Sequence, residues 1–129
     1  MARKKPHRLT PLEALIMDCV WDTKETTVRE VKDTLHPAKP MAYNTVLTVM
    51  RILRDKGFLK SRREGRSDVY AAVVTREQMA KRSLSEVLER FFAGSAGALV
   101  SQLLESEELA PEEIEAIRRE VDAKLRESA

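Results

Sequence analysis

The sequence predicts a mainly α-helical fold with one small β-hairpin and a helical C-terminal region. Two observations favour this class. Along most of the 129 residues, apolar side chains recur at spacings of three and four, as on one face of a helix. Between residues 58 and 74 the pattern changes to two short strands around a glycine-containing turn.

The first helix is expected to begin at Pro11. Thr10 is a favourable N-cap, Pro11 suits the first helical position, and Glu13 is placed to complete a capping box. Trp21 is expected to close the helix against the core. The predicted apolar stripe of this helix consists of Leu12, Leu15, Ile16, Cys19 and Val20.

Two further short helices are predicted before the hairpin. Thr27 and Glu30 repeat the capping-box pattern, and the helix they begin ends near His36-Pro37, because proline cannot continue it. The next helix is expected over residues 42–56, with Gly57 as its C-terminal cap. Its predicted core face consists of Val46, Val49, Met50 and Leu53.

The opposite face of that third helix carries short hydrogen-bonding side chains and one guanidinium. An α-helix fits the major groove of DNA, where base edges present distinct donors and acceptors. Asn44 can pair with an adenine edge, Thr45 and Thr48 can contact a base or a phosphate, and Arg51 can reach a phosphate. Leu47 lies near this face and either contacts a thymine methyl group or packs beneath the neighbouring helix.

A basic hairpin follows, with strands expected over 58–63 and 68–74 and a turn at 64–67. Three short helices followed by a hairpin is the order of a winged helix-turn-helix. Cations at the tip suit a phosphate or the minor groove. The residues expected to contact DNA from the hairpin are Arg62, Arg63 and Arg66. A basic arm with a similar role is expected from Arg3, Lys4, Lys5 and Arg8.

The remaining chain is predicted to form a helical dimerisation domain over residues 75–129, after a DNA-binding domain over 1–74. Thr75 and Gln78 cap the next helix, small residues interrupt it at 93–98, and Pro111 begins the last one. The apolar surface exceeds what so few helices can hide alone, so we expect a homodimer; the alternative is that the stripe packs back on its own domain. The expected interface consists of Leu84, Val87, Leu88, Phe91, Leu99, Leu103, Ile114, Ile117 and Val121.

Charge separates the two parts of the chain. Residues 1–82 carry 18 Lys and Arg against 10 Asp and Glu, whereas residues 83–129 carry 5 against 11. The first part is suited to a polyanion that would repel the second. The chain has one cysteine and no signal-peptide or membrane-spanning pattern, which indicates a cytoplasmic protein without an intrachain disulfide.

Several motifs together resemble the penicillinase-repressor family. They are Leu9–Glu13, Ile16-Met17 with Val20-Trp21, Ala42–Thr48, Leu53 with Lys56-Gly57, and the hairpin Gly65–Tyr70. The resemblance covers about residues 9–126. It implies a homodimeric transcriptional repressor whose winged helices bind double-stranded palindromic operator DNA, in a resistance or stress-response operon.

The resemblance also implies how such proteins are inactivated. In the β-lactam branch a membrane sensor protease triggers cleavage in the dimerisation helices, and the family's Asn-Phe bond aligns here with Gln102-Leu103. The copper branch carries a C-terminal cysteine cluster, which this chain lacks. Cys19 lies on an apolar stripe and is expected in the core, so we expect no metal site and no cofactor.

Two other functions are weighed against a repressor. One is a winged-helix module that contacts an acidic protein and binds no specific DNA. The other is a catalytic regulator with a hydrolase or metal site. The sequence has no phosphate loop, nucleophile elbow or metalloprotease motif, so we expect no enzymatic activity.

Overall fold

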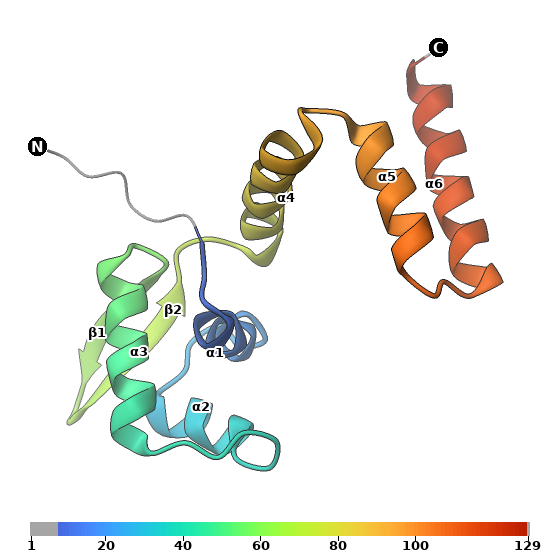
Figure 1. Ribbon diagram of the computed structural model, residues 1–129. Helices are drawn as coiled ribbons and strands as arrows, with labels where there is room; N and C mark the ends of the chain where they lie inside the picture. Colours follow the sequence, from blue (N-terminus) through green and yellow to red (C-terminus); the bar gives the residue numbers. More distant parts are fainter. Residues whose placement is uncertain (1–7, 129) are drawn as a thin grey trace, which may run out of the picture. The chain divides into compact units, whose positions relative to one another are not determined.

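The computed structural model describes residues 8–128, which form a helical fold with one hairpin (Figure 1). The chain divides into two compact units, the first ending at Ser85 and the second beginning at Glu86. The elements in order are α1 (Pro11–Trp21), α2 (Val28–Leu35), α3 (Tyr43–Asp55), β1 (Leu59–Glu64), β2 (Ser67–Ala72), α4 (Arg76–Phe92), α5 (Ala96–Ser106) and α6 (Pro111–Ser128).

Helices α1 and α2 begin with the two expected capping boxes. The Thr10 hydroxyl accepts from the Glu13 amide at 3.1 Å, and the Glu13 carboxylate accepts from the Thr10 amide at 2.8 Å. Thr27 and Glu30 make the same pair of bonds at 3.2 and 3.1 Å. Both boxes satisfy amide groups that have no partner within the helix.

The buried face of α1 is rotated from the predicted stripe, which was partly wrong. Ile16 and Val20 are fully buried, as expected, and so is Met17. Leu12, Leu15 and Cys19 are only half-buried and pack at the margin of the core. Glu13 takes the remaining buried position because its carboxylate has partners there.

Helix α3 ends where the glycine was expected to end it. Gly57 has φ +91°, its amide donates to the Arg54 carbonyl at 3.0 Å, and the Phe58 amide donates to the Leu53 carbonyl at 2.9 Å. This pair of bonds is a Schellman motif, which requires a left-handed residue after the helix. Phe58 is then buried, so the cap directs the chain into β1.

The hairpin is antiparallel and pairs Leu59 with Ala72 through to Glu64 with Ser67. Its strands are shifted by one or two residues from the predicted ones, and the turn is the two-residue Gly65-Arg66, with Gly65 at φ +62°. Thr26 adds a bridge to β2: its amide donates to the Tyr70 carbonyl at 2.9 Å and its carbonyl accepts at 2.7 Å. The α1–α2 loop is thereby tied to the hairpin.

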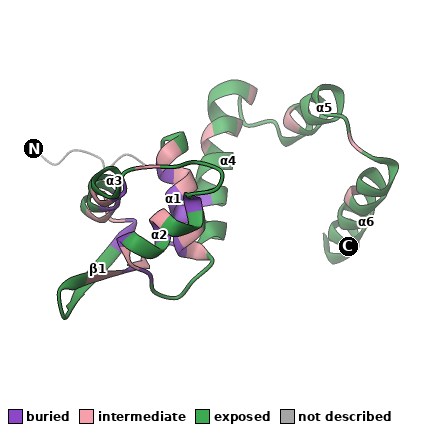
Figure 2. Ribbon diagram, turned by 90° about the horizontal axis from the view of Figure 1, so that it is seen from below, coloured by how far each residue is buried: buried purple, intermediate pink, exposed green. Residues whose placement is uncertain are grey.

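The core lies between α1, α2, α3, the hairpin and the start of α4 (Figure 2). Tyr70 is its largest fully buried side chain. Trp21 closes α1, because its indole donates to the Val74 carbonyl at 2.9 Å. The full set of buried apolar residues is Ile16, Met17, Val20, Val28, Val31, Leu35, Val46, Met50, Leu53, Phe58, Leu59, Tyr70, Val74 and Met79.

The second unit contains the end of α4 and helices α5 and α6. The predicted interruption after α4 is shorter than expected: Ala93 and Gly94 have φ +48° and +80°, and Ser95 already caps α5. Neither α5 nor α6 has a buried residue, although both carry apolar faces. These helices therefore form no core of their own.

Candidate nucleic-acid interface

Helix α3 presents a polar face to solvent. Asn44, Thr45, Thr48 and Arg51 are all exposed, because the buried Val46, Met50 and Leu53 fix the opposite face against the core. Ile52 is 42% exposed on the same side of the helix. Ile52 was not assigned to this surface from the sequence, although it falls four residues after Thr48.

A partly buried ion pair holds the C-terminal end of α3 against α1. The Lys56 ammonium lies 2.7 Å from the Glu13 carboxylate, which is only 6% exposed. Burial raises the pKa of Glu13, but hydrogen bonds from Lys56 and Thr10 outweigh it, so the pKa lies below its ordinary value. The N-terminal cap of α1 thus also positions the polar helix.

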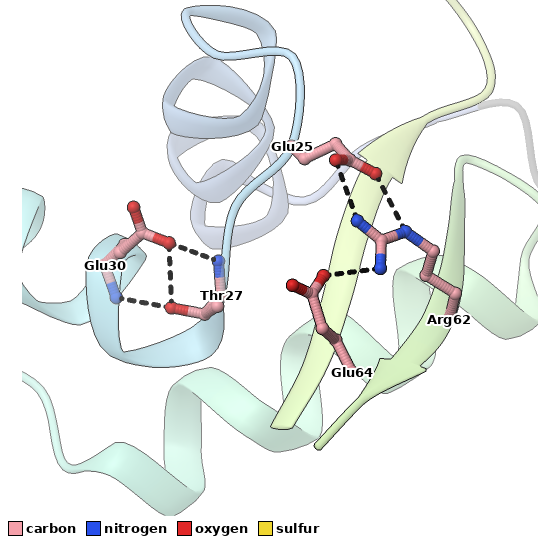
Figure 3. Close-up of polar contacts among 5 residues, drawn as sticks. All are labelled: Glu25, Thr27, Glu30, Arg62 and Glu64. Carbon is pink, nitrogen blue, oxygen red and sulfur yellow. Dashed lines mark hydrogen bonds and ion pairs between the residues drawn. The ribbon is translucent and has the colours of Figure 1, made fainter. Parts of the chain in front are cut away.

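Arg62 is engaged within the chain, between Glu25 of the α1–α2 loop and Glu64 of β1 (Figure 3). Its Nε and Nη2 atoms donate to the two Glu25 oxygens at 3.1 and 3.0 Å, and Nη1 donates to Glu64. These bonds raise the pKa of Arg62 and lower that of Glu25. The Glu25 and Glu64 carboxylates therefore neutralise Arg62, which was predicted from the sequence to contact DNA.

The tip of the hairpin keeps cations of its own. Arg63 donates to the Gly65 carbonyl at 3.3 Å and lies 3.6 Å from the Asp68 carboxylate. Within the described part of the chain, Arg66 forms no ion pair, and its side chain stands at the two-residue turn. Arg66 therefore has its charge available to an external anion.

A groove of about 360 Å³ connects the start of α2, the first half of α3 and the hairpin tip. The Arg29 guanidinium lies 6.0 Å from the centre of the Tyr43 ring on its edge. Leu47, whose role the sequence left open between a base contact and packing, is half-buried. It packs against the core and lines this groove. The lining residues are Thr27, Val28, Arg29, Tyr43, Leu47, Arg51, Arg63, Arg66, Ser67 and Asp68.

The expected interface residues of the C-terminal region are accessible. Phe91 is 71% exposed, and Leu84, Val87, Leu103, Ile114 and Val121 are exposed as well. Leu88, Leu99 and Ile117 are half-buried. Gln102 and Leu103 lie inside α5, where the Gln102 amide donates to the Ser106 hydroxyl at 2.8 Å.

Other expectations concern metals, the membrane and the basic arm. Across residues 8–128 no three His, Cys, Asp or Glu side chains are grouped to hold a metal ion, and no helix has the length and apolar character needed to cross a bilayer. Burial, with Asp18 and Asp22 nearby, raises the pKa of the Cys19 thiol. Of the predicted arm, Arg3, Lys4 and Lys5 lie outside the described residues.

Comparison with known proteins identifies the family. The family model for the penicillinase repressor matches residues 9–123, which is most of the chain. The chain belongs to the penicillinase-repressor family. The resemblance to this family that the sequence motifs indicated is thereby confirmed.

Members of the penicillinase-repressor family cover nearly the whole chain. Transcriptional regulator BlaI of Mycobacterium tuberculosis is 32% identical over 114 residues, 87% of this chain and 81% of that protein. Methicillin resistance regulatory protein MecI of Staphylococcus aureus is 21% identical over 93% of this chain and 98% of its own length. Both are described as regulators, not as enzymes.

A solved structure confirms the winged-helix fold of the first unit. The solution structure of the DNA-binding domain of the repressor BlaI superposes with a TM-score of 0.51 and 25% identity. It covers 58% of this chain and 90% of that domain. The hairpin β1–β2 is the wing of this fold.

Proposed function

We propose that the chain is a transcriptional repressor that acts in the cytoplasm by binding operator DNA. The observation that carries this is the solvent-facing side of α3, where Asn44, Thr45, Thr48 and Arg51 lie beside a cationic wing in a family of repressors. A helix with one buried face and one face of donors and acceptors suits the major groove.

The proposed division of labour follows the surroundings of each side chain. Asn44, Thr45 and Thr48 contact base edges, while Arg51, Arg63 and Arg66 contact the phosphate backbone. Arg62 was expected to join the second group. Because its guanidinium is occupied by Glu25 and Glu64, we propose that it positions the wing instead.

We further propose that the repressor binds as a homodimer to a palindromic operator. The support is that α5 and α6 carry apolar side chains but bury none of them. Ile114, Val121 and Leu125, for example, are each about half or more exposed. Apolar surface of this extent requires a partner. A second copy is the simplest one, because a two-fold dimer presents two reading helices to two half-sites.

Release from DNA by a sensor protease is a separate proposal. Cleavage between Gln102 and Leu103 would cut α5 and so damage the proposed interface. Since these residues are helical, that part of α5 must first open locally. Mass spectrometry of the protein from induced cells would show fragments ending at Gln102; an intact chain after induction excludes this route.

The test of the repressor proposal is selection from a pool of random-sequence duplexes, followed by titration at several salt concentrations. We expect one enriched palindrome that binds about 10³-fold or more tightly than a scrambled duplex at physiological salt. Equal binding of the two duplexes would overturn the proposal and favour the alternative, a winged-helix module for an acidic protein.

A further inference from the structure

The groove at the base of the wing carries more positive charge than the reading helix needs. Four of its lining residues are arginines, at positions 29, 51, 63 and 66. The lining contains one carboxylate, Asp68, which lies 3.6 Å from Arg63 and offsets the charge of that arginine only. Within the described residues, Arg29, Arg51 and Arg66 form no ion pair.

These three cations reach the same hollow from three elements: α2, α3 and the hairpin turn. Like charges placed together repel one another unless an anion joins them. The hollow of about 360 Å³ is roughly ten times the volume of one water molecule, which leaves room for a hydrated phosphate group. Guanidinium groups match the geometry of phosphate oxygens.

The position of the groove favours a phosphate of the DNA backbone over free inorganic phosphate. Arg51 belongs both to the groove and to the proposed DNA-facing side of α3, and Tyr43 and Leu47 lie between that side and α2. An anion held here therefore lies next to any strand that α3 reads.

We infer that this groove is a phosphate-binding site that takes the backbone of the DNA strand beside the one read by α3. Arg29, which the sequence did not single out, is a principal ligand, and the Tyr43 ring positions its guanidinium. Arg66 binds the same phosphate from the wing. The inference rests on the proposed function, and it adds an interaction that is indifferent to base sequence.

The test counts bound phosphates through the salt dependence of binding. Full-length parent protein and the variants Arg29→Gln, Arg66→Gln and Arg29→Lys are titrated onto a selected operator and a scrambled duplex of equal length. Lys24→Gln is the matched control, because it removes one positive charge from the same unit but lines a separate hollow with Trp21. Circular dichroism checks that each variant is folded.

We expect both Gln variants to lower the slope of log affinity against log salt by about 0.9 for each phosphate that is no longer neutralised, on both duplexes. Arg29→Lys should keep the parental slope, as should Lys24→Gln. The ratio of specific to scrambled binding should not change in any variant. If Arg29→Gln keeps both the parental salt slope and the preference for the operator, the assignment of the groove as a phosphate-binding site is wrong, and the repressor proposal is unaffected.

Two direct binding experiments separate other anions. If inorganic phosphate binds the parent but not Arg29→Gln, and Arg29→Gln keeps the parental salt slope on duplex DNA, the groove takes free phosphate and the backbone assignment is wrong. If polyglutamate does so, the groove takes an acidic protein chain. A parent that does not distinguish the two duplexes overturns the proposed function, while the Arg29→Gln slope still tests the groove.

Discussion

At the scale of single residues, Glu13 links helix capping to the placement of α3. Its carboxylate accepts from Thr10 and pairs with Lys56, and its residue is 5% exposed. Replacing it with Gln should lower the free energy of unfolding at neutral pH by about 1–3 kcal/mol, because a buried charged hydrogen bond is removed. Urea unfolding measures the difference.

The effect of Glu13→Gln should depend on pH in one direction. Since the pKa of Glu13 is lowered by folding from its ordinary value of 4.5, its stabilisation is complete above that pH and is lost as the pH falls through the folded value. The gap between parent and variant should therefore narrow in acid. Glu30→Gln, at the exposed capping box, is the control; an equal effect there would show that Lys56 contributes nothing.

The exposed polar side chains of α3 belong to the same scale. Asn44→Ala or Thr48→Ala should each weaken operator binding by about 1–3 kcal/mol, because a base edge is left without its hydrogen-bond partner, while binding to a scrambled duplex stays unchanged. Fluorescence anisotropy with both duplexes measures this. Normal operator binding by both variants would remove Asn44 and Thr48 from the proposed reading face.

At the scale of elements, the wing is joined to the α1–α2 loop by the Glu25–Arg62 ion pair (Figure 3) and by the Thr26–Tyr70 bridge. Glu25→Arg or Arg62→Glu alone should weaken operator binding, since each breaks a bidentate pair that orients the wing. The double exchange should restore much of the affinity. Titration of the four proteins as a double-mutant cycle measures the coupling.

Arg62→Gln adds a distinct readout for the wing. If Arg62 positions the wing, its removal should reduce affinity a few-fold yet leave the salt slope at the parental value, because the same number of phosphates stays neutralised. A slope lowered as in Arg66→Gln would instead make Arg62 a DNA ligand, as the sequence suggested. Gln is chosen here because it removes the charge without adding a repulsive one.

Helix caps and turn residues in the sequence predicted the helices and the hairpin well, but they could not predict which distant residues would pair. Thr10, Thr27 and Gly57 act through neighbours three to five residues away, so their effects are readable along the chain. The partners Glu25 and Arg62 are 37 residues apart and meet beside the Thr26–Tyr70 bridge, which joins the α1–α2 loop to the hairpin. The groove also depends on this tertiary arrangement.

The predicted apolar stripe of α1 illustrates the same limit. Periodicity identifies a helix but does not fix its rotation, which the neighbouring elements decide. Glu13 is buried with Lys56, a residue far along the chain, as its partner, whereas Leu15 packs at the margin of the core. On α3, three of the four predicted core residues, Val46, Met50 and Leu53, are buried and Val49 is half-buried, so the predicted polar side chains face solvent.

At the scale of the whole molecule, dimerisation can be tested apart from DNA binding. Replacing Ile117 and Val121 with Glu should yield monomers in sedimentation and weaken operator binding, since each half-site is then bound independently. Arg119→Glu, which lies about opposite these residues on α6, is the matched control. A double variant that stays dimeric would place the interface elsewhere.

The lack of buried residues in α5 and α6 has a consequence for gene dosage. If two chains must meet before either can cover these helices, active repressor forms in proportion to the square of chain concentration when dissociated chains predominate. Halving synthesis would then remove about three quarters of the active species. A cell could lift repression sharply by slowing production alone, without destroying a single repressor molecule.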